Sequence, residues 1–335
     1  MIKVLIVDDS AFMRVKIRKA VESDPLIRVA GTARCGADAI KRAVDLSPDV
    51  ITMDVQMPDM SGLEAVERIM ELSPVPIIMI SSLTSHGADI TLRALEMGAV
   101  DYIPKDEITD DLLISKIHMA KSAVLNPSCN AQAPASNPVQ RFSVIGIGIS
   151  TGGPKALAQF IPKISGDITA SIVIAQHLPP HFTQSLADRL DSMSEIRVKE
   201  AEDQEPLLPG WAYICPGGYH ALINEKKRIV LASKAEYSQY HYTPSVDLLM
   251  GSIGRVYGRE GLCIIMTGMG NDGAKGIGIA REHGSCIIAQ SEESSTIYGM
   301  PKAVIDNKLH HRIVDLQHMH TVINDLCRPA PISQS

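Results

Sequence analysis

Short apolar runs rich in β-branched residues alternate with amphipathic stretches along most of the chain. In the first 120 residues the apolar runs lie at 3–7, 27–32, 50–53, 77–81 and 101–104. Apolar residues at helical spacing occur between them, at 11–23, 37–46, 61–71 and 89–97. This alternation is typical of a parallel sheet covered by helices. We predict five strands and five helices in a flavodoxin-like, doubly wound α/β domain over residues 1–120.

The same alternation continues in the second half of the chain. Its clearest strand candidates are 143–146, 170–175, 211–214, 228–232, 263–266 and 286–289. We predict a second doubly wound parallel-sheet domain over residues 141–335, larger than the first and Rossmann-like with three layers. Residues 121–140 hold Pro, Ser, Asn, Gln and Ala with few large apolar groups. Such a stretch buries too little surface to offset its ordering entropy, so we expect a flexible linker there.

Composition narrows the classes of protein that fit. The 335 residues are 45% hydrophobic and carry a formal net charge of −6, so nucleic acid is not an expected partner. We see neither a signal peptide nor an apolar run near the roughly 20 residues of a membrane span, and expect no membrane insertion. The six cysteines lack C-x-x-C spacing, which argues against a zinc site or a disulfide framework. We therefore expect a cytoplasmic protein with reduced cysteines.

Ligands of parallel sheets usually bind beyond the carboxyl ends of the strands. In the first domain, polar residues follow the apolar runs at these positions. Asp8 and Asp9 follow the first run and Asp54 ends the third, while Ser81 and Lys105 close the fourth and fifth. Each acid alone fits a helix cap. Three converging carboxylates repel one another, however, and favour a hard cation such as Mg²⁺. A lysine and a hydroxyl beside that cation suit a phosphoryl group.

A glycine-rich turn, GIGISTGGP at 146–154, opens the second domain. A Walker A loop would need lysine where Pro154 stands, and a dinucleotide fingerprint would need glycine where Thr151 stands. The pattern G-x-S-x-G fits at residues 148–152. That match is short, so the rest of the domain has to support a nucleophilic serine.

The strand-end rule yields a second set of polar residues. The runs SVIGIG, ASIVIAQ and LCIIMTGMGN lead to Ser150, His177 and Asp272, which are a hydroxyl, a base and an acid. A serine hydroxyl becomes nucleophilic when a base takes its proton and an acid orients the base. Taken singly, Ser150 also fits a helix cap, His177 a loop histidine and Asp272 a turn residue. His181 is a rival for the role of the base. The order Ser, His, Asp differs from the order Ser, Asp, His of α/β-hydrolases, so the G-x-S-x-G match is not an α/β-hydrolase elbow.

Two glycine-dense turns flank this set. Gly152 and Gly153, with Pro154, force a tight turn into a helix beginning near Lys155. Backbone N–H groups at such a turn suit a developing oxyanion. The segment TGMGNDG at 267–273 is a second turn that offers an amide from Met269.

Residues 1–120 resemble the response-regulator receiver family in VLIVDDS, DVITMDVQMPDMSGLEA, MISS and YIPK. The resemblance implies phosphorylation of Asp54, with Asp8 and Asp9 in the acidic pocket. It assigns Mg²⁺ to Asp9, Asp54 and the Gln56 carbonyl, and the phosphoryl oxygens to Ser81 and Lys105. The chain departs from the family pattern in one place, because Asp106 follows Lys105 where receivers usually carry proline. A trans bond there and the added charge bear on the rate and lifetime of phosphorylation.

Residues 142–325 resemble the CheB-type protein-glutamate methylesterase domain. The matching motifs, in order, are IGISTGGP, IAQHLPP, ICPGGYH, TPSVDLLM, MTGMGNDGAKG and YGMPKAVI. The resemblance implies a triad of Ser150, His177 and Asp272, with oxyanion stabilisation by backbone amides near Thr151 and Met269. It further implies hydrolysis of glutamate methyl esters on chemoreceptors with release of methanol, and deamidation of receptor glutamines. No cofactor is expected for the esterase reaction.

The tandem order of the domains suggests how they cooperate. We expect a chemotaxis histidine kinase to be the phosphodonor, and the unphosphorylated receiver to hinder access of a monomeric enzyme to its chemoreceptor substrates. Two alternatives stay open: a non-catalytic receiver-linked binding module, and the same chemistry in a sensory pathway other than flagellar chemotaxis. A nucleotide-binding second domain is disfavoured by the displaced lysine and the missing glycine of the 146–154 turn.

Overall fold

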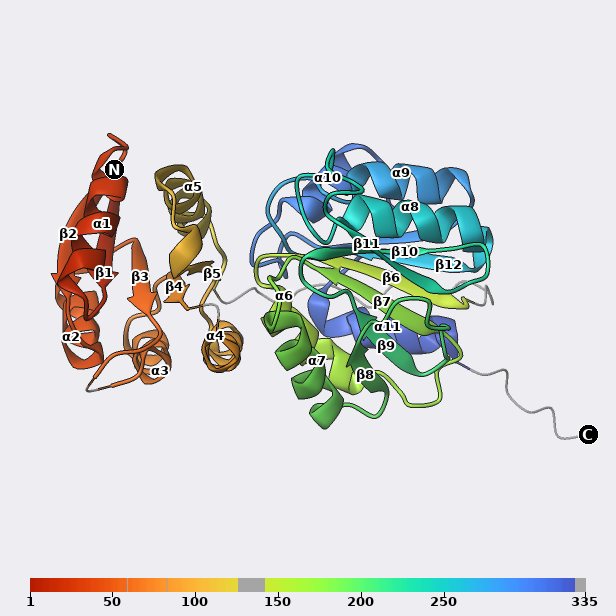
Figure 1. The fold of residues 1–335 in the computed structure, drawn as a ribbon, viewed down its shortest axis with the longest axis horizontal. Helices are drawn as coiled ribbons and strands as arrows, with labels where there is room; N and C mark the ends of the chain where they lie inside the picture. The colour runs from red at the N-terminus through yellow and green to blue at the C-terminus, as the bar shows by residue number, and fades with distance from the viewer. Residues whose placement is uncertain (59, 83, 126–141, 329–335) are drawn as a thin grey trace, which may run out of the picture. The chain divides into compact units, whose positions relative to one another are not determined.

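A computed structural model describes residues 1–58, 60–82, 84–125 and 142–328 of the chain (Figure 1). The chain divides into two compact units between residues 126 and 127. Of the linker predicted at 121–140, residues 126–140 lie outside the described residues.

The first unit is built on a five-stranded parallel sheet in the order β2-β1-β3-β4-β5. Its strands are β1 (Ile2–Val7), β2 (Ile27–Ala33), β3 (Val50–Asp54), β4 (Ile77–Ser81) and β5 (Asp101–Pro104). Its helices are α1 (Ala11–Glu22), α2 (Gly36–Leu46), α3 (Gly62–Leu72), α4 (Ser85–Met97) and α5 (Asp110–Lys121), with a 3₁₀ turn, η1, at Lys105–Glu107. Helices α1 and α5 cover one face of the sheet and the other three cover the opposite face. The predicted doubly wound fold is confirmed.

Side-chain caps fix where several of these helices begin. Ser61 accepts from the backbone N–H of Glu64, whose carboxylate accepts in return from the N–H of Ser61, forming a capping box at the start of α3. The hydroxyl of Thr84 accepts from the N–H of Gly87, and that cap starts α4 four residues before the apolar spacing predicted it.

The second unit holds a seven-stranded parallel sheet in the order β14-β13-β12-β6-β7-β9-β8. Its strands are β6 (Val144–Ile149), β7 (Ser171–Gln176), β8 (Arg197–Glu200), β9 (Trp211–Ile214), β12 (Gly261–Ile265), β13 (Cys286–Gln290) and β14 (Arg312–Val314). Its helices are α6 (Gly153–Phe160), α7 (Phe182–Met193), α8 (Val246–Tyr257), α9 (Ala274–Glu282), α10 (Met300–Asp306) and α11 (Leu316–Cys327), with 3₁₀ turns η2 (Ile161–Lys163) and η3 (Gly258–Glu260). Helices α8, α9 and α10 cover one face and α6, α7 and α11 the other. This confirms the predicted three-layer α/β architecture.

One predicted strand of the second unit pairs outside the large sheet. The stretch at 228–232 is β11 (Ile229–Ser233), which forms an antiparallel two-stranded sheet with β10 (Tyr219–Ile223). A turn with Lys227 in the left-handed region (φ 58°) connects the two strands. This hairpin and the segment after it lie off the parallel sheet, between β9 and α8 in the sequence.

Two glycines in the central strand β6 let helix α8 approach it closely. A Cβ added at Gly146 would lie 2.5 Å from Ile253 Cδ1, and one at Gly148 would lie 2.2 Å from Val246 Cγ1. Real Cβ atoms essentially never come that close to another atom. The glycines are therefore required for the packing of α8 on β6, independently of any ligand.

Two further features concern the cysteines and the helices of the described residues. Cys35, Cys215, Cys263, Cys286 and Cys327 are free thiols, and Cys129 lies outside the described residues. Within the described part of the chain, no helix combines the length and apolar character needed to cross a bilayer.

Candidate active site

Ser150, His177 and Asp272 meet at the carboxyl edge of the large sheet, where the strand order reverses. Ser150 follows β6 and His177 follows β7. Asp272 stands seven residues after β12, because that strand ends at Ile265 and a glycine-rich loop leads back to the edge. Strands β12 and β7 flank β6 on opposite sides, so the three side chains converge at the topological switch point, the usual ligand site of such sheets.

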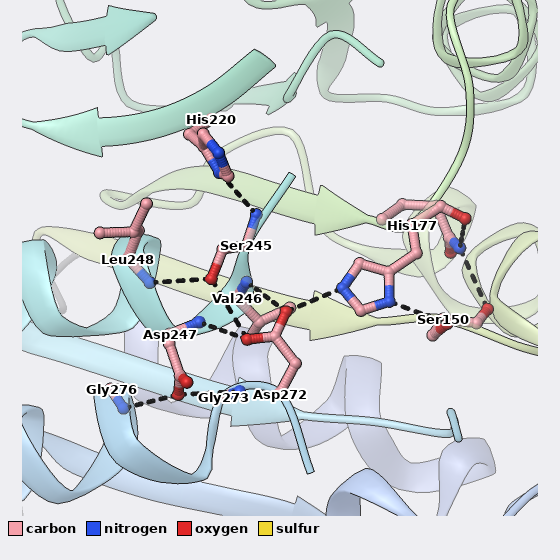
Figure 2. Close-up of polar contacts among 11 residues, drawn as sticks. Ser150, His177, His220, Ser245, Val246, Asp247, Leu248, Asp272, Gly273 and Gly276 are labelled. Atoms are coloured by element: carbon pink, nitrogen blue, oxygen red, sulfur yellow. Dashed lines mark hydrogen bonds and ion pairs between the residues drawn. The ribbon is translucent and has the colours of Figure 1, made fainter. Parts of the chain in front are cut away.

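His177 lies between the other two side chains (Figure 2). Its Nδ1 is 3.0 Å from Ser150 Oγ, and its Nε2 is 2.9 Å from Asp272 Oδ2. The imidazole side chain is 11% exposed and that of Asp272 is 6% exposed. Both contacts are within hydrogen-bond range and are largely shielded from water.

Asp272 is held by the first turn of helix α8 as well as by His177. Its carboxylate accepts from the backbone N–H groups of Val246 (2.8 Å) and Asp247 (3.0 Å), and from the hydroxyl of Ser245 (3.2 Å). Burial by itself raises the pKa of Asp272, but the hydrogen bond and charge of His177 and these N–H groups outweigh it and leave the pKa below its usual value. The positive end of the α8 dipole acts in the same direction. Asp272 is therefore ionised near neutral pH.

The ionised carboxylate determines which imidazole nitrogen carries the proton. A carboxylate accepts hydrogen bonds only, so Nε2 of neutral His177 must be the N–H that donates to Asp272. Nδ1 then has a free lone pair and accepts from the hydroxyl of Ser150. The arrangement leaves a base directed at a hydroxyl, which is the requirement for activating a serine.

Helices α8 and α9 hold each other through two carboxylates. Asp272, just before α9, caps α8, while Asp247 in α8 accepts from the N–H groups of Gly273 (2.9 Å) and Gly276 (2.8 Å) at the start of α9. A Cβ at Gly276 would lie 2.2 Å from the Asp247 carbonyl oxygen, so the two helices touch at this point. Burial raises the pKa of Asp247, against the lowering effect of those N–H groups.

A buried histidine also stabilises the N-terminal cap of helix α8. Nδ1 of His220 accepts from the backbone N–H of Ser245 at 3.1 Å, and Ser245 Oγ caps Leu248 and contacts Asp272. The rings of Tyr237 and Tyr240 face His220 edge-on, and its Nε2 is buried without a hydrogen-bond partner. Burial lowers the pKa of His220, which agrees with an unprotonated Nδ1.

Backbone contacts fix the turn that carries Ser150. The Ser150 N–H donates to the Thr267 carbonyl (3.0 Å), and the Ser150 carbonyl accepts from the N–H of Gly153 (2.8 Å) and from Nε2 of Gln176 (3.0 Å). Gly152 has φ 78°, a conformation that disfavours other residues. Helix α6 begins at Gly153, two residues before the predicted start.

The loop after β12 lies against the serine. A Cβ at Gly268 would lie 2.7 Å from Ser150 Cβ, and Thr267 Oγ1 donates to the Thr151 carbonyl at 2.9 Å. Thr151 is buried and Met269 is exposed. The two residues predicted to stabilise an oxyanion thus belong to segments that meet at Ser150, and their role stays a prediction.

Among the described residues, the hydrogen bonds of the Ser150 hydroxyl and the Asp272 carboxylate do not involve His181, the rival base. It is exposed, has φ 70° and precedes helix α7. The residues that sequence reasoning missed are His220, Tyr242, Ser245 and Asp247. Ser245 and Asp247 belong to the quoted stretch TPSVDLLM, so a signal was present, but nothing in the spacing indicated which residues they contact.

The first unit has its own polar site at the switch point between β1 and β3. One ligand atom from each of Asp8, Asp9 and Asp54 lies within 4.8 Å of the others. Lys105 Nζ is 2.8 Å from Asp54 Oδ2 and 3.9 Å from Asp8 Oδ2. The structure therefore brings together the three predicted acids and the predicted lysine.

The acids fit a divalent cation. Burial and the nearby charge of Asp54 raise the pKa of Asp8 to about 6, and burial raises that of Asp54 despite Lys105. Asp8 Oδ2 is buried without a hydrogen-bond partner. A buried carboxylate oxygen beside two further acids is what a hard, oxygen-preferring cation such as Mg²⁺ would satisfy.

The contacts of the other predicted receiver residues do not correspond directly to the roles predicted for them. Ser81 Oγ accepts from Thr91 Oγ1 at 2.7 Å and lies within hydrogen-bond range of the carbonyls of Ser82 (3.2 Å) and Gly87 (3.4 Å), so its contacts are with helix α4 and the residue that follows β4. The N–H of Gln56 donates to Asp54 Oδ1 at 3.3 Å. Phosphoryl binding by Ser81 and metal binding by the Gln56 carbonyl stay predictions.

Comparisons with known proteins match both units. Residues 145–323 match the family described as CheB methylesterase, and residues 4–118 match the response regulator receiver domain. The protein-glutamate methylesterase/protein-glutamine glutaminase of Halalkalibacterium halodurans is 45% identical, covering 98% of each chain. The protein of the same description from Thermotoga maritima is 40% identical, covering 91% of this chain and 92% of its own. The crystal structure of the Thermotoga maritima CheB methylesterase catalytic domain covers 56% of this chain and all of its own, at 35% identity and a TM-score of 0.53.

Proposed function

The chain belongs to the family of CheB protein-glutamate methylesterases/protein-glutamine glutaminases that carry a response regulator receiver domain, and on this premise we propose that Ser150, His177 and Asp272 are its catalytic triad. The observation that carries the proposal is the position of His177, 3.0 Å from a serine hydroxyl and 2.9 Å from an ionised carboxylate.

In the first half of the proposed reaction, Ser150 attacks the carbonyl carbon of a glutamate methyl ester. His177 Nδ1 accepts the hydroxyl proton as the new C–O bond forms, and the imidazolium is stabilised by Asp272. The tetrahedral intermediate collapses as Nδ1–H gives that proton to the departing methoxide. Methanol leaves, and the glutamyl group stays on Ser150 as an ester.

In the second half, His177 Nδ1 accepts a proton from water, whose oxygen attacks the acyl-enzyme. The proton then returns to Ser150 Oγ, and glutamate is released. The backbone N–H groups of Thr151 and Met269 stabilise the oxyanion of both intermediates, a contribution worth about 3–4 kcal/mol per donor in serine hydrolases. With a glutamine substrate the leaving group is ammonia, and the remaining steps are the same.

The receiver regulates this reaction by phosphorylation, for which we propose Asp54 as the acceptor. Asp8, Asp9, Asp54 and the Gln56 carbonyl would hold Mg²⁺, which would neutralise charge on the incoming phosphoryl group. Lys105 pairs with Asp54 and is positioned to pair with a phosphoryl oxygen. Ser81 would have to turn from its contacts with α4 to bind a second oxygen.

Family membership also supports the proposed partners. The substrates would be methylated chemoreceptors, and the phosphodonor a chemotaxis histidine kinase. We place the monomeric enzyme in the cytoplasm, where such a kinase has ATP and where the free thiols of the described cysteines stay reduced.

The test of the catalytic proposal is methanol release from methyl-labelled receptor membranes. Ser150→Ala should lower turnover by about 10⁴-fold or more, because no other group in the site replaces the nucleophile. Its thermal unfolding midpoint should match that of the parent protein. Ser192→Ala is the matched control, since the exposed Ser192 hydroxyl bonds only to a carbonyl within α7.

Turnover retained by Ser150→Ala would refute the nucleophile assignment. If the unaltered protein released no methanol from any methylated receptor while a serine-directed probe still labelled Ser150, the substrate would be wrong and the triad would stand.

A further inference from the structure

An aromatic ring lies against the face of the proposed base. Tyr242, in the segment between β11 and α8, stacks on His177 with ring centroids 4.5 Å apart and an interplanar angle of 7°. The triad assignment gives this residue no role. Tyr242 is half-buried, and burial together with the charge of Asp272 raises the pKa of its phenol, so the ring is neutral at working pH.

The two hydrogen bonds of His177 do not by themselves fix its ring plane. Both act at the edge of the imidazole, toward Ser150 and toward Asp272, and leave rotation about the line between those partners. A parallel ring at van der Waals distance blocks that rotation on one face. Because a general base must keep its lone pair directed at the hydroxyl, restricting the plane aids proton transfer.

Tyr242 is itself held in place. His241 packs edge-on against it, with centroids 4.9 Å apart at an angle of 85°. The backbone of Gly270 also lies near the Tyr242 hydroxyl, since a Cβ at Gly270 would lie 3.3 Å from its oxygen. A ring confined in this way can restrain His177, whereas a mobile ring could not.

The stacking also discriminates between the two charge states of the base. The face of a neutral aromatic ring attracts a cation. In the proposed mechanism His177 acts as a base, so it gains a positive charge when it takes the serine proton. The attraction is therefore stronger in the transition state than in the ground state, which is the condition for an interaction to raise kcat.

We propose that Tyr242 is a positioning residue of the esterase, which fixes the ring plane of His177 and favours its charged form through its aromatic face. The proposal rests on the proposed role of His177 and adds a residue to it. It requires the aromatic face and not the phenolic hydroxyl.

The test compares Tyr242→Phe and Tyr242→Leu in the full-length protein by methanol release. Tyr242→Leu should lower kcat roughly 5- to 50-fold with KM unchanged within about twofold, because it removes both the restraint and the cation–π attraction. Tyr242→Phe should have a kcat within about threefold of that of the parent protein, because it keeps the aromatic ring. Tyr219→Leu, which removes an exposed tyrosine of the same domain, should leave kcat unchanged.

A second readout reports the stacking directly. In proteins labelled at histidine, the ring protons of His177 should show the upfield shift of a stacked neighbour in the parent and in Tyr242→Phe, and should lose it in Tyr242→Leu. If Tyr242→Leu fails to fold, Tyr242→Met fills similar volume without a ring and gives the same comparison.

Three results would overturn the proposal. They are unchanged kcat in Tyr242→Leu, a rise in KM alone, or a Tyr242→Phe variant as impaired as Tyr242→Leu. Ser150→Ala in the same assay tests the catalytic proposal separately. Turnover retained by Ser150→Ala would refute the triad, whatever the Tyr242 variants show.

Discussion

His177 shows how one residue's chemistry is determined by neighbours far apart in sequence. Asp272, capped by the first turn of α8, is ionised, and its charge places the imidazole proton on Nε2. Nδ1 is therefore the nitrogen that faces Ser150. The direction of the base follows from the helix that stabilises the acid.

His220 makes the support of this site sensitive to pH. An unfolded histidine takes up a proton near pH 6.5, whereas burial lowers the pKa of His220 in the fold, so the unfolded state binds the proton first. The stabilising contribution is thus complete above pH 6.5 and is lost as pH falls through the folded pKa. His220→Asn keeps an acceptor for the Ser245 N–H without titrating.

We expect the loss of unfolding free energy between pH 7.5 and 5.5 to be smaller in His220→Asn than in the parent. Urea unfolding followed by fluorescence of Trp211 measures this, since Trp211 is the only tryptophan and lies in β9 of the same unit. Equal losses in both proteins would show that protonation of His220 does not limit stability in acid.

At the scale of residues, the sequence predicted that Ser150, His177 and Asp272 lie together, but not which residues surround them. Ser150, His177 and Asp272 follow apolar strand runs, and the edge of a parallel sheet brings such residues together. His220 and Tyr242 come from the hairpin and from the segment that follows it, which leave the sheet. Their contacts depend on how that segment folds back, and no spacing in the sequence encodes it.

The element that supports the site is the pair of helices α8 and α9. The first turn of each helix donates to a carboxylate that belongs to the other. Helix α8 donates to Asp272, which lies just before α9, and α9 donates to Asp247 of α8. Moving either helix breaks the cap of the other. The pair therefore acts as one structural unit that fixes the position of Asp272.

Asp247→Ala should lower the unfolding free energy of the second unit by about 1–3 kcal/mol, because it removes a helix cap and leaves the N–H groups of Gly273 and Gly276 unpaired. Urea unfolding followed by Trp211 fluorescence measures the change. Asp306→Ala, which breaks only an exposed ion pair with Lys302 on α10, should cost less than about 1 kcal/mol. Equal stability of the two variants would contradict the proposed mutual capping.

Among the strands of the large sheet, those with both faces buried were predictable and the two at its edges were not. The runs of β6, β7, β12 and β13 are apolar because helices cover both faces. Strands β8, with the sequence RVKE, and β14, only three residues long, lie at the two edges of the sheet and lack that signature. The strand order is likewise a tertiary property, set by which helices pack across which face.

In the whole molecule, two sheets of the same class carry two different sets of polar residues. Both gather polar residues where the strand order reverses, carboxylates with a lysine in one unit and a serine, histidine and aspartate in the other. The sequence predicted both positions because the strand-end rule is independent of which ligand is bound. It did not predict the contacts of Ser81, which depend on the packing of α4.

Coupling between the units is tested by methanol release from receptor membranes with Mg²⁺ and a small phosphodonor. We expect release by the full-length protein to rise roughly 5-fold or more, a modest coupling free energy for a regulated enzyme. Asp54→Ala should show no rise, because the proposed acceptor is gone. Asp45→Ala, at an exposed position on α2, should respond like the parent. An undiminished rise in Asp54→Ala would place phosphorylation elsewhere.

The glycines of β6 have a consequence for anyone who re-engineers this enzyme. Gly148 lets Val246 approach β6, and Val246 is also a donor to Asp272, so even an alanine at 148 would push the acid away from the base. Substitutions at these buried positions would therefore lower the activity, although the positions lie away from the reacting atoms. A directed-evolution library for new ester substrates should therefore keep Gly146 and Gly148 constant.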